Sequence, residues 1–267
     1  MTDDRAFAIR ETPAPGAPSR ARIRVEIGVV LALSLGASAV YAVVQLLDDL
    51  TKGPLSSQTA TLNQSQADRS WFDLAYQLIG IAVDLAPVAL VGYLLWRSSR
   101  PHLSRLGIDR FRPRPDLGGA AAIALMIGIP GLGLYFAGRA LGFTVNVVPT
   151  ALDAYWWTIP VLLLSALRSG LQEEVIAVGY LYARLGDLGW GRWRIILASA
   201  LLRGTYHLYQ GPGAFLGNAV MGVVFGWIYT RWGRLLPLVI THTLLDAAVF
   251  VGYPLVAGYF PALFPRS

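Results

Sequence analysis

Long apolar runs are the feature that most limits how this chain can fold. The first extends from Ile27 to Leu47 without a charged residue. At about 1.5 Å per helical residue, a run of this length crosses the roughly 30 Å hydrocarbon core of a bilayer. Similar runs follow at about 72–96, 117–137, 156–185, 195–208, 214–229 and 235–251. The pattern predicts an all-α fold, a polytopic transmembrane helix bundle.

The number of spans is about seven or eight. The eighth would come from the last apolar piece, Tyr253 to Phe264, which is short and interrupted by proline. A polar linker rich in Ser, Thr and Gln follows the first run, from Asp48 to Ser70, but no linker divides the chain into domains and no internal repeat is visible. We therefore expect a disordered basic cytoplasmic arm at 1–24 and a single transmembrane domain at 25–267.

The charge pattern agrees with a membrane protein. Charged residues make up 14% of the chain, whereas soluble domains carry about 25%. The net charge of +6 is basic, as in many nucleic-acid-binding proteins. However, the arginines lie in short segments between the apolar runs, which is the pattern that orients membrane proteins. We therefore expect a lipid bilayer around the chain and no nucleic acid partner.

The arginine clusters also predict the orientation. The largest cluster, Arg97 to Arg114, should be cytoplasmic together with the N terminus, and the loop at 56–70 should lie outside. The use of Arg in place of Lys, with abundant Ala and Gly, indicates a bacterial source and hence the plasma membrane. The absence of cysteine excludes disulfides, thiolate catalysis and zinc–cysteine sites.

Two adjacent glutamates interrupt the fourth run. The whole chain has four glutamates, and two of them are Glu173 and Glu174. Each acidic group at mid-membrane costs about 2.5–3.5 kcal/mol on insertion scales. One interpretation is a helix end at the lipid surface, where carboxylates cost little. The other is a carboxylate pair that faces a wet cavity inside the bundle and forms its active site.

Two histidines and an aspartate lie in later runs. His207 is in the fifth, and His242 is in the seventh, four residues before Asp246 on the same helix face. A carboxylate can act as a general base toward water, and imidazole can hold that water or donate to an oxyanion. His207 and His242 with a carboxylate also suit zinc with an open position, so zinc is a possible cofactor. Any one of these residues alone could be a satisfied polar group of the core.

Together these residues resemble a family, the CPBP intramembrane proteases. The family includes the type II CAAX prenyl endopeptidases and the ABI group linked to bacteriocin processing and immunity. The resemblance covers roughly residues 150–251, and the earlier residues add only compatible spans. It implies an intramembrane endopeptidase acting on a membrane-associated peptide or protein substrate, possibly CAAX-like or bacteriocin-related. Family accounts differ on whether a metal takes part.

The resemblance also implies roles for the residues. Glu173 is similar to the general base that activates water, and Glu174 to the supporting glutamate. His207 and His242 are similar to the family histidines, and Asp246 to the last polar member of the motif.

Two positions depart from the family pattern. Where the family has arginine after its glutamates this chain has Val178, and where it has phenylalanine before its histidine this chain has Arg203. A buried arginine needs a carboxylate partner. The sequence therefore predicts an exchange, in which Arg203 reaches Glu174 from the fifth span. Arg168 is a rival counterion, but its place on the helix points it elsewhere.

Two other functions fit a membrane bundle with buried carboxylates. An inactive relative could act as a scaffold or immunity protein and retain the pocket without turnover. An ion-coupled transporter also needs intramembrane carboxylates, although such proteins often show repeated halves. A lone intramembrane residue, Asp84, we interpret as a buried structural hydrogen-bonding group, since no partner lies near it in the sequence.

Overall fold

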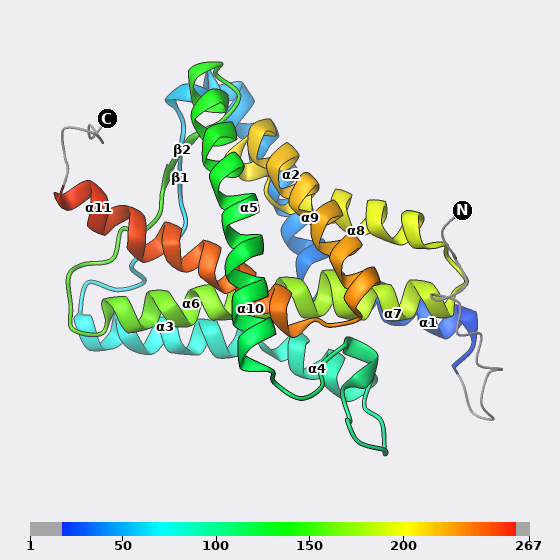
Figure 1. Cartoon of the computed structure of the whole chain (residues 1–267). Coiled ribbons are helices and arrows are strands. Elements are labelled where there is room, and N and C mark those ends of the chain that lie inside the picture. The colour runs from blue at the N-terminus through cyan, green and yellow to red at the C-terminus, as the bar shows by residue number, and fades with distance from the viewer. Residues whose placement is uncertain (1–17, 260–267) are drawn as a thin grey trace.

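The computed structural model describes residues 18–259, without the side chains of 257–259. Helices dominate this part of the chain, and two short strands pair in parallel (Figure 1). Most of the predicted arm, 1–17, and the end of the last apolar piece lie outside the described residues. The elements run in this order: α1 (Arg20–Ala32), α2 (Leu35–Lys52), η2 (Leu55–Ser57), β1 (Thr59–Thr61), α3 (Ser70–Asp84), α4 (Ala86–Leu94), η3 (Ser104–Leu106), α5 (Pro113–Ala140), β2 (Asn146–Val148), α6 (Thr158–Glu173), η4 (Glu174–Tyr180), α7 (Leu181–Asp187), α8 (Arg192–Tyr206), η5 (Leu208–Gln210), α9 (Pro212–Trp232), α10 (Leu236–Ala247), η6 (Ala248–Gly252) and α11 (Tyr253–Tyr259).

The first predicted span is broken and begins earlier than expected. Helix α1 includes Arg20 to Arg24, which the sequence assigns to the disordered arm. Helices α1 and α2 then meet at a bend of 54°. At the bend, a Cβ atom on Gly36 would lie 2.8 Å from the carbonyl oxygen of Leu31, so glycine permits this close turn. The predicted span from Ile27 to Leu47 therefore contains a bend that the sequence did not predict, and its two helices meet the length and composition of a span only together.

Four of the other predicted runs form helices long and apolar enough to cross a membrane. Within residues 18–259 these are Ser70–Leu94, Pro113–Ala140, Pro212–Trp232 and Leu236–Val256, and the bent α1–α2 pair raises the number to five. The last of them joins α10 to the start of the final apolar piece, so that piece does not begin a separate span. The chain is thus a helical, multi-pass membrane protein, as predicted.

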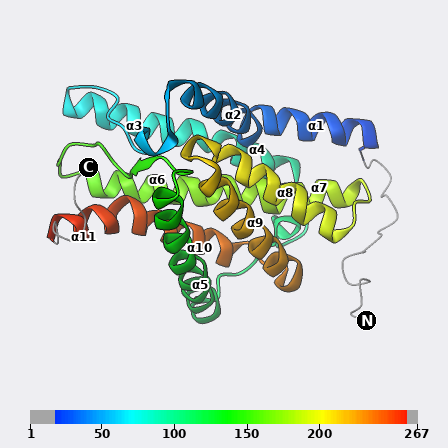
Figure 2. The same ribbon diagram turned by 90° about the horizontal axis from the view of Figure 1, so that it is seen from above.

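The two remaining predicted spans form the centre of the bundle. Helices α6 and α7 continue through the π-helical segment η4 as one rod (Figures 1 and 2). The rod contains charged residues that interrupt its apolar character. Helix α8 is only 15 residues long. Neither therefore has the length and composition of an ordinary span. Every residue from Glu174 to Tyr182 is buried, because neighbouring helices surround this rod.

Two glycines let neighbouring helices of the bundle approach one another closely. A Cβ atom on Gly170 of α6 would lie 2.9 Å from the carbonyl oxygen of Val239 in α10. A Cβ atom on Gly222 of α9 would lie 2.8 Å from the Cα atom of Ala200 in α8. Small residues at such crossings are typical of membrane bundles. The first crossing lies one helical turn from Glu173, and it therefore sets the approach of α10 to the glutamates.

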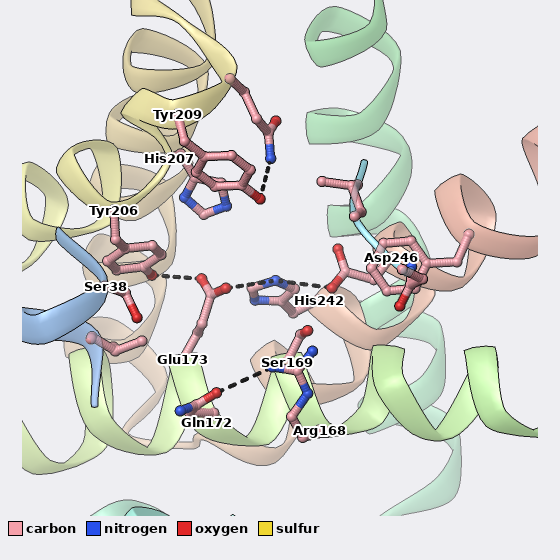
Figure 3. Close-up of a pocket in the computed structure, with 15 residues that line it drawn as sticks. Ser38, Arg168, Ser169, Gln172, Glu173, Tyr206, His207, Tyr209, His242 and Asp246 are labelled. Carbon is pink, nitrogen blue, oxygen red and sulfur yellow. Dashed lines mark hydrogen bonds and ion pairs between the residues drawn. The ribbon is translucent and has the colours of Figure 1, made fainter. Parts of the chain in front are cut away.

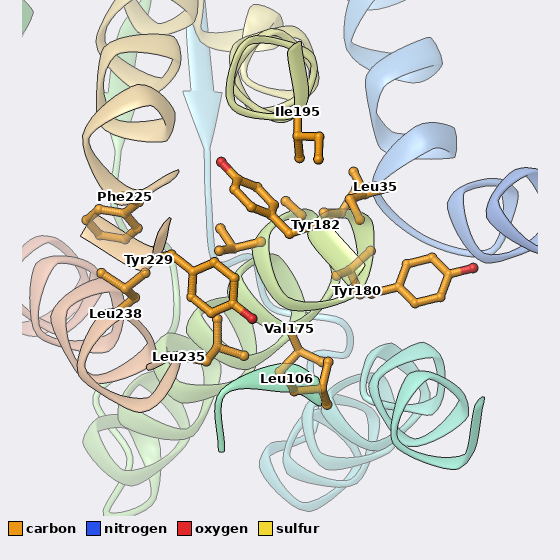
Figure 4. Close-up of a cluster of buried hydrophobic side chains, with 14 of the residues drawn as sticks. Leu35, Leu106, Val175, Tyr180, Tyr182, Ile195, Phe225, Tyr229, Leu235 and Leu238 are labelled. Atoms are coloured by element: carbon orange, nitrogen blue, oxygen red, sulfur yellow. The ribbon is translucent and has the colours of Figure 1, made fainter. Parts of the chain in front are cut away.

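The apolar core lies along η4 and α7. Tyr180, Tyr182 and Phe225 are buried there with leucines of the loop before α5 and of α10 (Figure 4). Burying a large apolar side chain contributes about 1.5–3 kcal/mol in a soluble protein, but between lipid-embedded helices the gain comes from close packing instead. This part of the bundle is filled with side chains.

The connections gather at two ends of the bundle. At one end lie the arginine-rich turns, at 97–112, 184–194 and 231–234. Arg105 binds Asp187 at 2.6 Å, and Arg234 binds Asp109 at 3.1 Å, so ion pairs join these turns to one another. At the other end β1 pairs with β2. There the backbone N–H of Val145 also donates to the carbonyl of Gln210. The two sets of turns therefore mark opposite ends.

Candidate active site

The two glutamates occupy the junction between α6 and η4. Glu173 is the last residue of α6, and Glu174 begins the π-helical segment. Neighbouring residues on a helix point about 100° apart. The side chain of Glu174 is accordingly fully buried, whereas that of Glu173 retains 13% of its exposure and faces a cavity. Short π-helical segments are frequent at functional sites.

Glu174 is held by an arginine and a histidine. Its Oε1 atom lies 2.6 Å from Nη2 of Arg203 and 2.7 Å from Nδ1 of His242. Arg203 is completely buried and also lies 3.6 Å from Glu173. This confirms the predicted pairing of Arg203 with Glu174 across helices. Val178, at the family arginine position, is a buried apolar residue.

A cavity of about 230 Å³ opens beside Glu173 (Figure 3). Its wall is mostly polar and comes from α2, α6, α8, η5, α10, η6 and the loop that follows β1. The lining residues are Leu35, Ser38, Leu62, Asn63, Arg168, Ser169, Gln172, Glu173, Tyr206, His207, Tyr209, Gln210, His242, Asp246 and Phe250.

A tyrosine fixes one oxygen of Glu173. The hydroxyl of Tyr206 donates to Oε2 at 2.5 Å, which leaves Oε1 toward the cavity. Charge-assisted hydrogen bonds of this kind are short and strong. Sequence reasoning missed Tyr206, because a tyrosine in an apolar helix has the pattern of a core residue. Its position directly before His207 was the one available signal.

His207 presents one free ring nitrogen to the cavity. Its Nδ1 atom lies 3.0 Å from the carbonyl oxygen of Arg203. A carbonyl only accepts, so Nδ1 carries the proton and Nε2 has a lone pair available. The ring also stacks near Tyr209, with centroids 6.5 Å apart. His207 can therefore accept a hydrogen bond from a water molecule in the cavity.

His242 connects the buried glutamate to the open part of the site. Its Nδ1 atom is committed to Glu174, while Nε2 lies 3.9 Å from Oε1 of Glu173 and 3.7 Å from Oδ2 of Asp246 (Figure 3). Three carboxylates thus surround this ring. Asp246 lies on the same face of α10, as the four-residue spacing predicts.

Arg168 stands at the outer part of the cavity. It pairs with Asp84 of α3 at 3.2 Å, and its Nη1 atom is 3.5 Å from Gln172. The side chain of Asp84 is 48% exposed, so the interpretation of Asp84 as a buried hydrogen-bonding group is wrong. Its partner is distant in the sequence, which is why sequence reasoning did not find it. The pairing also removes Arg168 as a counterion for Glu174.

The histidines and carboxylates of the site do not form a preformed metal centre. Within residues 18–259, no three His, Cys, Asp or Glu side chains converge at the spacing that holds a metal ion. His207 and His242 each keep Nε2 toward the cavity, but one protein ligand more is needed at zinc distance. The arrangement of the described residues does not fit a preformed zinc site.

All five residues predicted from the sequence come together with Arg203. The third histidine, His102, does not: it stacks on Trp96 at the arginine-rich end. Arg168, Gln172, Tyr206 and Tyr209 join the site from positions that carry no motif.

Comparison with known proteins identifies this part of the chain. Residues 155–248 match the model of the family described as type II CAAX prenyl endopeptidase Rce1-like. The matched segment contains the complete constellation from Glu173 to Asp246. No curated protein and no solved structure matches the chain.

Proposed function

We propose that this chain, whose residues 155–248 belong to the Rce1-like family of CAAX-type intramembrane proteases, is an endopeptidase that hydrolyses peptide bonds of membrane-associated substrates. The observation that carries the proposal is the setting of Glu173. One of its oxygens is fixed by Tyr206, and the other faces a polar cavity between two histidines. A carboxylate held in this way is prepared to take a proton from water.

The mechanism uses a water molecule held between Glu173 and His207. Glu173 takes a proton as the water oxygen attacks the carbonyl carbon of the substrate. His242 can carry a second proton on Nε2 and donate a hydrogen bond to the oxygen that becomes negative. Glu173 then passes its proton to the amine that leaves. The carbonyl carbon thus keeps the hydroxyl group of the water, and the amine nitrogen receives the proton.

Glu174 and Arg203 position the reacting groups. Glu174 accepts from Nδ1 of His242, which fixes the ring and directs Nε2 into the cavity. Arg203 balances the charge of Glu174 and lies 3.6 Å from Glu173. Asp246 lies within reach of the same Nε2 atom and can orient the ring or contact the substrate.

The proposal has a zinc-dependent alternative. His207 and His242 are the candidate ligands, and a movement of Glu173 or Asp246 would have to complete the site. A zinc ion would polarise the carbonyl and activate water. Metal content of the purified protein, measured with activity before and after chelation, decides between the two mechanisms.

The orientation follows from the arginines. The arginine-rich end, with the N terminus, is assigned to the cytoplasm of a bacterial cell, and the protein to the plasma membrane. The substrate is a peptide or protein segment in or at this membrane.

One experiment tests the peptidase assignment against its alternatives. Membrane peptides from cells that produce the wild-type protein are compared by mass spectrometry with those from cells that produce Glu173→Gln. A protease yields cleavage products that are absent from the variant. An inactive scaffold, an immunity protein or a transporter yields identical peptides, and a phenotype retained by Glu173→Gln would favour the scaffold.

A further inference from the structure

The cavity ends at one glutamate on the central rod. All four cavity residues contributed by α6, namely Arg168, Ser169, Gln172 and Glu173, precede Glu174. Every residue from Glu174 to Tyr182 is buried. The space on that side is occupied by the apolar core of Figure 4. The cavity beside Glu173 therefore does not continue past Glu174 toward the arginine-rich end, and the hollow lined by Tyr93, Trp96 and Leu103 at that end shares no residue with it.

Exposure falls in one direction through the site. The side chain of Asp246 is 23% exposed, that of Glu173 is 13% exposed and that of His242 is 5% exposed. Glu174 and Arg203 have no exposure. The mouth of the cavity consequently lies on the side of Asp246, and its floor is the buried ion pair.

The loops that line the cavity come from a single end of the bundle. Leu62 and Asn63 directly follow β1, and Tyr209 and Gln210 form the turn after α8. Backbone hydrogen bonds join these loops through β2 and its flanks, from Val145 to Gln210 and from Ala151 to Asn63. No residue of the arginine-rich turns lines the cavity within residues 18–259.

We infer that the active site receives water and substrate from the face opposite the arginine-rich turns, which is the outer face of the membrane. Positive loops remain on the cytoplasmic side. The substrate class is therefore a peptide segment exposed at the outer surface, such as part of an exported or membrane-anchored protein. A lipidated tail in the cytoplasm would meet the packed end of the bundle. The identity of this occupant as a substrate rests on the proposed function, whereas the direction of access does not.

The lack of cysteine makes this inference directly testable. Single variants Ser38→Cys and Ser169→Cys place a thiol in the cavity wall. Ser56→Cys marks the loop before β1, and Ser99→Cys marks the arginine-rich loop, where both serines are exposed. Intact cells are treated with a membrane-impermeant, positively charged thiosulfonate reagent, and labelling is compared with that of permeabilised cells.

We expect the reagent to label both cavity thiols in intact cells, as it labels Ser56→Cys, without permeabilisation. Ser99→Cys should react only after permeabilisation. Cavity thiols that react only together with Ser99→Cys, or that stay unreactive in both preparations, would overturn the inference. Labelling of Ser99→Cys in intact cells, with Ser56→Cys protected, would overturn the orientation and with it the outer-face assignment.

The labelling pattern is independent of catalysis. Each thiol variant is also made with Glu173→Gln, and the pattern should be unchanged. If the pattern holds while no cleavage product is found for the wild-type protein, the direction of access stands and the peptidase function fails. Cleavage products together with cavity thiols that are accessible only from the cytoplasm would give the opposite result.

Discussion

Two arginine–carboxylate pairs flank Glu173, and they differ in almost every physical respect. Arg203 and Glu174 are fully buried at 2.6 Å, whereas Arg168 and Asp84 meet at 3.2 Å where Asp84 is 48% exposed. Losing one partner of a buried pair leaves an uncompensated charge. Asp84 lies on the bundle surface within the span Ser70–Leu94, where its side chain is free to change its contacts. The difference teaches that the buried pair at the floor of the cavity is a fixed structural element, whereas the outer pair can be altered with little loss of stability.

The largest effect on stability should come from the floor. Arg203→Phe leaves Glu174 buried without its cation, and breaking a buried pair costs about 3–5 kcal/mol. Thermal unfolding in detergent should show this loss, together with loss of cleavage. Unchanged stability and activity would mean that Arg203 does not neutralise Glu174.

The family pattern suggests a way to restore the charge. Val178→Arg combined with Arg203→Phe returns the cation from the central rod itself. The double variant should recover part of the stability and activity that Arg203→Phe loses, and a double-mutant cycle measures the coupling. A double variant no better than Arg203→Phe alone would refute the exchange.

A smaller effect should come from the wall of the cavity. Tyr206→Phe removes a hydrogen bond to a charged acceptor, and such bonds contribute about 1.5–3 kcal/mol. If Tyr206 orients Glu173 for catalysis, kcat should fall by about 10- to 100-fold with little change in KM. Equal kcat in wild type and Tyr206→Phe would reduce Tyr206 to a packing role.

The smallest effect should come from the mouth. Asp84→Asn breaks the more exposed of the two pairs, and a polar contact between membrane helices contributes about 0.6–2 kcal/mol. The unfolding temperature should move slightly, and any kinetic change should fall on KM. A loss of stability as large as that of Arg203→Phe would show that the two ends of the site are equally rigid.

The buried part of the site was the more predictable from the sequence. Polar, titratable residues are costly in apolar runs, so the sequence alone singles them out as candidates for a functional site. These are Glu173, Glu174, His207, His242 and Asp246. The pairing of Arg203 followed from the need of a buried cation for a carboxylate, and the geometry confirms it.

Other features depended on contacts that no local pattern encodes. Asp84 finds its partner on a different helix, and Tyr206 has the character of a core residue. The bend after α1 rests on a close contact at Gly36. The contribution of Asn63 to the cavity depends on the pairing of β1 with β2, and strands this short leave no pattern in the sequence that predicts it.

The role of Glu173 as general base is the central claim, and one measurement addresses it directly. Wild type and Glu173→Gln are purified, reconstituted in liposomes and assayed with a substrate peptide found by mass spectrometry, after thermal unfolding has shown that both are folded. Glutamine keeps the shape and the hydrogen bond from Tyr206 but cannot take the proton. A general base supplies about 10²–10⁴-fold, so kcat should fall by that factor. Full activity in folded Glu173→Gln would contradict the assignment.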